Sequence, residues 1–163
     1  MQALFVDKQI TWEQLEKKVI KPFMMISEDL SLSEEEKVQK MMVHGLSKQG
    51  LGGYGLSKAC VNSYTIELAQ RFPSMLINSC TPGFIATDLT RPFAERSGKR
   101  DPQEVGALPV EKGTIAPNYL MMGNLMLDIP DYESGRFYGS DAKRSPLHKS
   151  RSPGDPVYDG TFP

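Results

Sequence analysis

Apolar residues recur with two different spacings in the middle of the chain, and these spacings predict where a helix and a strand lie. Over residues 54–72 they recur near the helical period, and Pro73 ends the predicted helix. Residues 75–80 form a short apolar run between chain breakers, which is typical of a buried strand. A Pro-Gly pair at 82–83 ends this strand, and a Thr-Asp pair at 87–88 predicts the N-cap of a further helix.

The region before this segment is predicted to be helical. Thr11 is followed three residues later by Gln14, which predicts a capping box, and this helix is expected to end near Pro22. A second helix is expected to begin at Ser33, and we interpret its acidic first turn as a solvated face rather than a binding site. The apolar positions expected to face the core are Trp12, Leu15, Val19 and Ile20 in the first helix, and Val38, Met41 and Met42 in the second.

Residues 91–112, which follow the predicted turn, are polar and rich in proline and glycine, and we interpret them as a lid with short helices. Residues 113–127 are apolar and predict a covering helix, whose methionines are expected to be adaptable core rather than ligands. The residues expected to form its apolar face are Ile115, Leu120, Met121, Leu125 and Met126. A strand at 136–138 is expected to run parallel to the strand at 75–80, and residues 140–163 are expected to be an extended tail.

Composition gives no support for several classes of partner. The net charge of -1 over 163 residues gives no electrostatic reason to expect nucleic acid or a membrane surface as a partner. Cys60 and Cys80 form neither a disulfide framework nor a metal motif, which favours reduced thiols and a cytoplasmic location. His44 and His148 have no partners at metal-ligand spacing, so no metal is predicted; His44 is interpreted as a surface histidine, with an approach to substrate as the alternative. No stretch resembles a signal peptide or a membrane span.

Tyr54 and Lys58 are the first candidates for chemistry. They are four residues apart, so on a helix they lie on one face, one turn from each other. A phenol has a pKa of about 10. A nearby ammonium group favours the phenolate and lowers that pKa, and a general acid or base works best when its pKa is near the operating pH. The alternative is a half-packed tyrosine at a helix start and a solvated lysine.

The order of the motifs resembles one family, the short-chain dehydrogenase/reductases, and most closely its carbonyl reductase branch. The matching pieces are Tyr54-Gly-Leu-Ser-Lys58, then a helix and a strand, then Pro82-Gly-Phe-Ile-Ala-Thr87-Asp88, and finally Ser134-Gly-Arg-Phe-Tyr-Gly139 as the last strand. The resemblance covers residues 50–139 and implies an α/β fold, the C-terminal part of a Rossmann-like, doubly wound parallel sheet. It divides a single partial domain, 1–163, into a helical insertion at 1–48, a catalytic half at 49–139 and the tail at 140–163.

The resemblance also implies roles for individual residues. Tyr54 would donate a proton to a substrate carbonyl, and Lys58 would lower the pKa of Tyr54 and hold the nicotinamide ribose. The residues that would contact the nicotinamide end of the cofactor are Pro82, Gly83 and Ile85 through the backbone and Thr87 through its side chain. The reaction would be hydride transfer between NADPH, with NADH as the alternative, and a small ketone or aldehyde. The family also implies that the chain can form a homo-oligomer.

Two departures from the family pattern limit these implications. No glycine-rich strand-turn-helix unit for a dinucleotide pyrophosphate is recognisable. Residues 50–55 match G-x-G-x-x-G, but no convincing strand precedes them, and we interpret them as a mobile active-site loop rather than a phosphate cradle. The family's catalytic serine and asparagine have no match, and none of Ser27, Ser33 and Ser47 is assigned that role.

Two hypotheses of different class follow. The first is a carbonyl-reductase-type oxidoreductase that acts as part of a longer chain. The second is a non-catalytic remnant of a reductase that associates with other subunits through its helix at 54–72, because the equivalent helices form a dimer interface in many members of the family.

Overall fold

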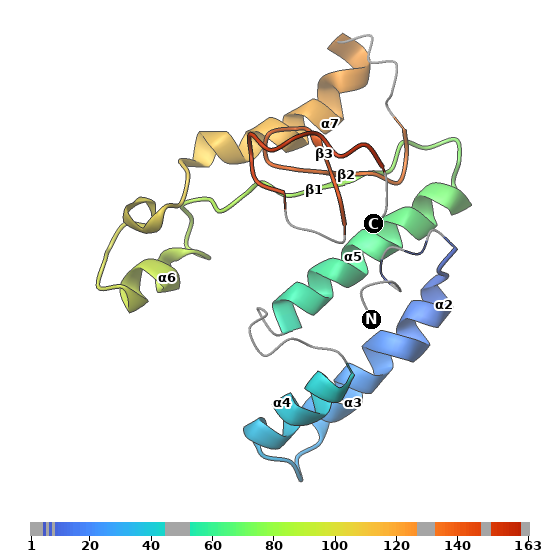
Figure 1. Cartoon of the computed structure of the whole chain (residues 1–163), viewed down its shortest axis with the longest axis vertical. Helices are drawn as coiled ribbons and strands as arrows, with labels where there is room; N and C mark the ends of the chain where they lie inside the picture. The colour runs from blue at the N-terminus through green and yellow to red at the C-terminus, as the bar shows by residue number, and fades with distance from the viewer. Residues whose placement is uncertain are drawn as a thin grey trace. The chain divides into compact units, whose positions relative to one another are not determined.

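The computed structural model describes residues 5, 7, 9–44, 53–126, 133–147 and 151–160. These residues form a mixed α/β structure that is mostly helical and contains one small three-stranded sheet (Figure 1). The chain divides into two compact units, Met1–Met75 and Leu76–Pro163. Ser47, the first half of the glycine motif at 50–52, and His148 lie outside the described residues. The expected division into insertion, catalytic half and tail stays a prediction.

The first unit contains one continuous helical run that passes through Pro22. It comprises α2 (Trp12–Leu15), a π-helical turn η1 (Glu16–Ile20) and α3 (Lys21–Glu28), so the predicted end near Pro22 is wrong. In η1 the N–H of Lys21 bonds to the carbonyl of Glu16, one residue further back than in an α-helix. This wider turn directly precedes the proline, which lacks the N–H that an α-helix would use there, and the helix continues without that hydrogen bond.

The capping box predicted at the start of α2 is confirmed. The N–H of Gln14 donates to Oγ1 of Thr11 over 3.2 Å, and the N–H of Thr11 donates to Oε1 of Gln14 over 3.1 Å. Two donors that have no partner within the helix are thereby satisfied by side chains.

The core of the first unit lies along this helical run. Four apolar residues are buried together, namely Ile10, Leu15, Val19 and Phe23. Partly buried residues pack against them from several segments, namely Phe5, Ile20, Met41, Leu56 and Cys60. The stripe predicted for α2 is therefore mostly confirmed, but Trp12 is 41% exposed and packs its ring 4.8 Å from that of Tyr64 instead.

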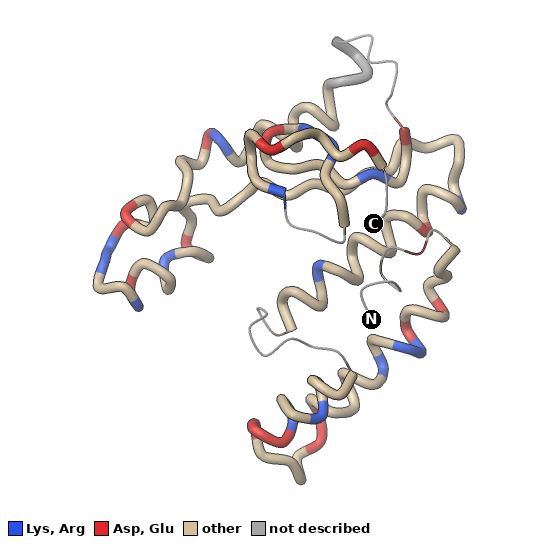
Figure 2. The backbone as a smooth tube through the Cα atoms, in the orientation of Figure 1, with Lys and Arg blue, Asp and Glu red and all other residues tan. Residues whose placement is uncertain are grey.

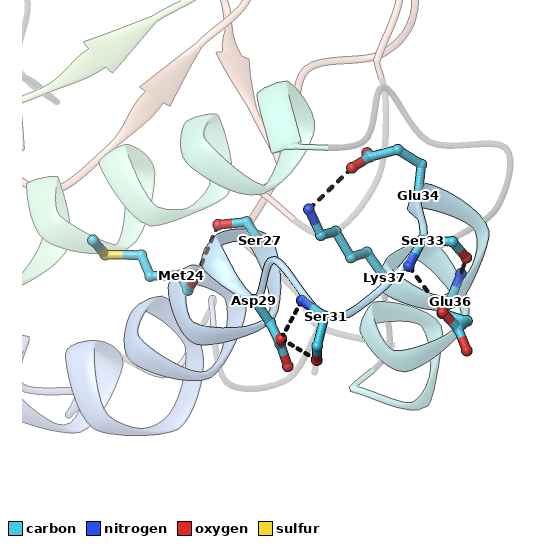
Figure 3. Close-up of polar contacts among 8 residues, drawn as sticks. All are labelled: Met24, Ser27, Asp29, Ser31, Ser33, Glu34, Glu36 and Lys37. Carbon is cyan, nitrogen blue, oxygen red and sulfur yellow. Dashed lines mark hydrogen bonds and ion pairs between the residues drawn. The ribbon is translucent and has the colours of Figure 1, made fainter.

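The short connection after α3 is held by side-chain hydrogen bonds to the backbone (Figure 3). The carboxylate of Asp29 accepts from both the N–H and the hydroxyl of Ser31, and these two bonds lower the pKa of Asp29. The next helix, α4 (Glu34–Val43), has Ser33 as its N-cap, and the Glu36 carboxylate accepts from the N–H of Ser33 over 2.8 Å. The start of α4 is acidic, as its red colour in Figure 2 shows, and at least one of these carboxylates caps the helix.

The apolar face predicted for α4 is only partly correct. Met41 packs against the core, whereas Val38 and Met42 are 42% and 39% exposed. His44 ends the helix and is exposed, with its ring edge toward Phe23 at a centroid distance of 6.1 Å. The surface position expected for His44 agrees with the structure.

Helix α5 (Gly53–Arg71) matches the helix predicted over 54–72 and ends before Pro73. It lies beside α2 within the same unit (Figure 1). The hydroxyl of Ser63, fully buried, donates to the carbonyl of Phe5 over 2.7 Å, and Leu56 and Cys60 pack against the core. The Gly-Tyr-Gly part of the glycine motif, 53–55, forms the first turn of this helix rather than a loop.

The sheet belongs to the second unit and has the strand order β1-β2-β3. β1 (Ser79–Cys80) is parallel to β2 (Phe137–Tyr138), as predicted, and β3 (Arg144–Ser145) is antiparallel to β2. β1 is shorter than the predicted strand at 75–80, because two backbone N–H groups donate to side chains instead of to a neighbouring strand. The N–H of Arg136 donates to Oδ1 of Asn78, and the N–H of Ile77 donates to Oγ of Ser134. β3 was not predicted, since residues 140–163 were expected to be an extended tail.

Short helices follow β1, as expected for residues 91–112. They are α6 (Arg91–Arg96) and the 3₁₀ turns η2 (Pro102–Val105) and η3 (Val110–Thr114), and α7 (Ile115–Met126) comes next. The face predicted for α7 is partly wrong, because Ile115 and Met121 are 42% and 73% exposed. Ala116 is buried instead, and the Tyr119 ring lies 5.9 Å from that of Tyr138 in β2. The side chains of Leu125 and Met126 lie outside the described set.

The tail is anchored by one buried arginine. Arg151, whose side chain is 4% exposed, donates two hydrogen bonds to the carboxylate of Asp141, over 2.8 and 2.9 Å. It also donates to the carbonyls of Asp155 and Pro156. The paired guanidinium lowers the pKa of Asp141, because it stabilises the charged carboxylate. None of the helices in the described part of the chain is long and apolar enough to cross a membrane.

Candidate active site

Tyr54 and Lys58 lie together at the beginning of α5. Tyr54 is the second residue of the helix and is 51% exposed, and Lys58 lies one turn later and is exposed as well. Nζ of Lys58 lies 5.2 Å from the centroid of the Tyr54 ring, which is the geometry of a cation–π contact. The structure therefore brings the two predicted catalytic side chains into one exposed group.

The packing of α5 explains why this pair faces away from the core. Leu56 and Cys60 pack against the buried cluster of the first unit. With about 3.6 residues per turn, these two positions lie roughly half a turn around the helix from Tyr54 and Lys58. A carbon atom added at Gly53 or Gly55 would meet nothing within 4 Å, so the surroundings of Tyr54 are open.

The other predicted site residues lie in the turn that follows β1. Gly83 has a φ of +91°, and its N–H donates to Oγ1 of Thr81 over 3.2 Å. A Cβ atom at this position would lie 3.1 Å from Cβ of Ser140, which follows β2. Glycine is required here both by the backbone conformation and by the close approach of two segments at the carboxyl ends of parallel strands. That edge is where open α/β sheets bind ligands.

Ile85 extends the backbone pairing beyond β1. It is 7% exposed and forms an isolated parallel bridge with Leu108. Of the five N–H groups from Gly83 to Thr87, three have hydrogen-bond acceptors, namely those of Gly83, Ala86 and Thr87. Among the described residues, the N–H groups of Phe84 and Ile85 have none. Two backbone donors are thus available at this turn.

The helix after the turn begins later than predicted. Thr87 and Asp88 do not form its N-cap; Thr90 does, and α6 begins at Arg91. The buried hydroxyl of Thr90 accepts from the N–H of Thr87 over 3.0 Å and lies 2.7 Å from the carbonyl oxygen of Ile85. The Thr90 hydroxyl thus gives backbone groups of the turn a hydrogen-bond partner within the turn itself. Asp88 forms an ion pair with Arg91 instead, over 2.5 Å.

Thr90 was missed at the sequence level, although a signal for it exists. Pro92 occupies an early position of α6, where proline is favoured because its missing N–H has no partner in a helix start anyway. A threonine two residues before such a proline is a good N-cap position, so Thr90 was a better choice than Thr87.

The predicted site falls in two parts. Tyr54 and Lys58 belong to the unit Met1–Met75, and Pro82, Gly83, Ile85 and Thr87 belong to the unit Leu76–Pro163. Each part is organised within its own unit. That the two parts face one ligand stays a prediction.

Each of the two units contains one free cysteine, Cys60 in the first and Cys80 in the second. Burial raises the pKa of the thiols of Cys60 and Cys80, so both are protonated near neutral pH and behave as small apolar side chains. Within the described part of the chain, no three or more His, Cys, Asp or Glu side chains are placed to hold a metal ion.

Over about half of its length, the chain is similar to the short-chain dehydrogenase/reductases, a class of oxidoreductases that generally use a nicotinamide cofactor. It is 36% identical over 85 residues to short-chain dehydrogenase/reductase 1 of Saponaria officinalis, a match that covers 52% of this chain and 22% of that protein. It is 33% identical over 67 residues to the (+)-neomenthol dehydrogenase of Arabidopsis thaliana, covering 41% of this chain and 19% of that protein.

The matches thus span 22% and 19% of the lengths of these curated relatives. No family model matches the chain. No solved structure matches it either. The resemblance to short-chain dehydrogenase/reductases that the sequence motifs predicted is confirmed as a partial, distant similarity.

Proposed function

We propose that the protein is an NADPH-dependent oxidoreductase of the carbonyl reductase type, which reduces small ketones or aldehydes and acts as part of a longer chain. The observation that carries this proposal is the exposed Tyr54–Lys58 pair, with the ammonium group 5.2 Å from the ring centroid. The partial similarity to short-chain dehydrogenase/reductases supports the class of reaction.

In this mechanism Tyr54 is the general acid. Its hydroxyl donates a proton to the carbonyl oxygen of the substrate, and Lys58 stabilises the negative charge that remains on the phenolic oxygen. The bound cofactor supplies the hydride that reduces the carbonyl carbon. In the reverse direction the phenolate accepts the proton of an alcohol. Both side chains are exposed on one helix face, which leaves room for a substrate beside the phenol.

The turn after β1 fits the nicotinamide end of the cofactor. The two N–H groups at Phe84 and Ile85 and the hydroxyl of the exposed Thr87 are donors of the kind that a carboxamide oxygen accepts. We propose that Pro82 and Gly83 shape this contact and that Lys58 binds the adjacent ribose. In the described residues before α5 there are only helices, so no strand-turn-helix cradle for the pyrophosphate is present there. The parallel β1–β2 pair would then be part of a Rossmann-like sheet.

Substitution of Tyr54 tests the assignment. NADPH oxidation is measured with a panel of ketones and aldehydes, using the longest form of the protein that its transcripts encode. Tyr54→Phe keeps the ring and removes the proton donor, and kcat should fall by about two to four powers of ten. Tyr64→Phe is the matched control, because the Tyr64 ring lies on the same helix but packs against Trp12. Its turnover should stay near wild type.

Lys58→Met should lower kcat as well and weaken cofactor binding, since the ammonium group is proposed to bind the ribose. Turnover of Tyr54→Phe close to that of wild type would refute the role of Tyr54. Loss of turnover in Tyr64→Phe as large as in Tyr54→Phe would show that the effect is structural.

The second candidate is a non-catalytic chain that associates through α5. The observation in its favour is that large apolar side chains are exposed on this helix and directly after it, with Val61 at 53% and Phe72, the residue that follows α5, at 42%. Absence of carbonyl turnover in every form of the protein, together with self-association that Val61→Asp abolishes, would favour this candidate. We propose a cytoplasmic location in either case, because both thiols are reduced.

A further inference from the structure

The second unit contains a cavity of about 500 Å³ that the proposed reaction does not use. It lies between α7, the β2–β3 hairpin and the tail. Its walls combine three aromatic and three basic side chains, namely Tyr119, Tyr138, Tyr158, Arg136, Lys143 and Arg144. None of these residues belongs to the candidate active site described above.

The register of the sheet explains why these side chains gather. Arg136 directly precedes β2, and its carbonyl accepts from the N–H of Ser79, so it continues the pairing with β1; it is two residues from Tyr138, and the two side chains therefore point to the same face. Arg144 in β3 is directly opposite Tyr138, and directly opposite residues of an antiparallel pair share a face. Two guanidinium groups and a phenol are therefore placed on one side of the hairpin by backbone pairing.

The cavity has an excess of positive charge. Arg136 forms an ion pair with Glu133, and among the described residues this is the one carboxylate that lines the cavity. Among the described residues, no carboxylate forms an ion pair with Arg144 or Lys143. Burial and, to a smaller extent, the charge of Arg144 lower the pKa of Arg136. Like charges held together in a partly buried site favour an anion between them.

Aromatic rings and a glycine hold the cationic group of Arg144 in place. Its guanidinium lies 5.2 Å from the Tyr158 ring centroid. A Cβ atom at Gly160 would be 2.9 Å from one of its nitrogens, so the tail backbone passes directly beside it. Tyr138 packs against Tyr119, and burial raises its pKa, so its hydroxyl stays a hydrogen-bond donor at neutral pH. The walls thus offer positioned donors for an oxyanion and aromatic faces for a ring.

We propose that this cavity binds a small aromatic anion, with its oxyanion group on Arg136 and Arg144 and its ring against the tyrosines. Aryl phosphates and aryl carboxylates share this chemistry, and guanidinium groups bind both oxyanions through paired hydrogen bonds. The site is independent of the proposed reductase activity, because none of its lining residues belongs to the candidate active site.

The test is calorimetric titration of the whole 163-residue chain at low salt with three probes: phenyl phosphate, benzoate and inorganic phosphate. Saturable one-to-one binding of phenyl phosphate or benzoate is expected, at least several-fold tighter than that of inorganic phosphate. The tighter of the two aryl anions identifies whether phosphate or carboxylate is the preferred group. Arg144→Gln should weaken binding about tenfold or more, because it removes one charge-assisted hydrogen bond.

Two further variants make the result decisive. Arg96→Gln is the matched control, since Arg96 also lies over an aromatic ring, that of Phe93 at 5.9 Å, but outside the cavity. Its affinity should equal that of wild type. Lys143→Gln changes an exposed side chain, so it should leave folding intact and weaken binding several-fold even if Arg144→Gln unfolds. Equal weakening by Arg96→Gln, equal affinity for inorganic phosphate, or no binding of either aryl anion would overturn the proposal.

Discussion

Single side chains hold the turn that follows β1. The hydroxyl of Thr90 lies within hydrogen-bond distance of Ile85 and Thr87, and Gly83 lets the chain pass within contact of Ser140. Neither role was predicted. The close approach of Gly83 and Ser140 depends on how two distant segments pack, whereas Pro92 gave a local signal for the position of Thr90. The Tyr54–Lys58 contact, in contrast, was predictable at this scale, since residues four apart on a helix are neighbours.

Gly83→Ala is expected to lower the free energy of unfolding more than Gly106→Ala does. Both glycines have a φ of +91°, but an added Cβ meets Ser140 at 3.1 Å in the first case and nothing within 4 Å in the second. Alanine at a positive φ costs about 1–2 kcal/mol. The steric contact should add about 1 kcal/mol or more for Gly83→Ala. Urea-induced unfolding measures both differences.

Ser140→Gly supplies the control for this comparison. Combined with Gly83→Ala it removes the contacting Cβ, so the extra loss should be recovered while the loss due to backbone conformation remains. Equal losses in Gly83→Ala and Gly106→Ala would mean that the contact with Ser140 carries no energy.

At the scale of elements, the helices of the first unit are held by one apolar stripe. Leu15 and Val19 are one turn apart on the run from α2 to η1, and both are fully buried against α5 and α3 residues. The stripe was predicted from the helical period, but its continuation through Pro22 to Phe23 was not. The π-helical turn η1 shifts the positions after it and lets Phe23 join the same buried cluster.

Leu15→Ala should destabilise the first unit by about 2–5 kcal/mol, because it leaves a cavity where a leucine is 1% exposed. Leu30→Ala is the matched control, since Leu30 is 96% exposed in the connection after α3. That substitution should change the free energy of unfolding by less than about 0.5 kcal/mol. Unfolding followed by far-ultraviolet circular dichroism gives both values; similar effects of the two substitutions would contradict the core assigned here.

At the scale of the whole molecule, the two units carry different parts of the proposed chemistry. The first unit presents the acid–base pair, and the second presents the turn at the end of the parallel strands and the basic cavity. Most of the hydrogen-bond donors proposed to bind the nicotinamide lie in the single turn that follows β1. The contacts that a dinucleotide pyrophosphate normally requires are not recognisable in the sequence.

The 163-residue chain by itself should therefore bind NADPH no more tightly than about millimolar. Charge-assisted hydrogen bonds to the phosphates contribute about 1.5–3 kcal/mol each. Loss of three of them, about 4.5–9 kcal/mol in total, raises the Kd by about three powers of ten or more, which moves a micromolar site to about millimolar or weaker. Nicotinamide fluorescence during titration of the purified chain measures this, with a longer form of the protein, where one is expressed, as the comparison. Saturable micromolar binding would show that a phosphate site has been missed.

Local patterns determined the start of α2, the extent of α5, its end before Pro73, and the contact of Tyr54 with Lys58. Each of these depends on hydrogen bonds or packing between residues within about one helical turn, so the information is contained in a short stretch of chain. The parallel pairing of β1 with β2 was also predictable, because two short apolar runs beside chain breakers indicate buried strands.

Tertiary structure alone decided the length of β1, the existence of β3, the face of α7 that is buried, and the basic cavity. The hydrogen bond that ends β1 joins Ile77 to Ser134, 57 residues away, and no local pattern encodes such a partner. Ala116 rather than Met121 is buried in α7, although methionine is the more apolar side chain to place in a core. Arg136 and Arg144 meet because an antiparallel register aligns them, and register is a property of two strands rather than of either sequence.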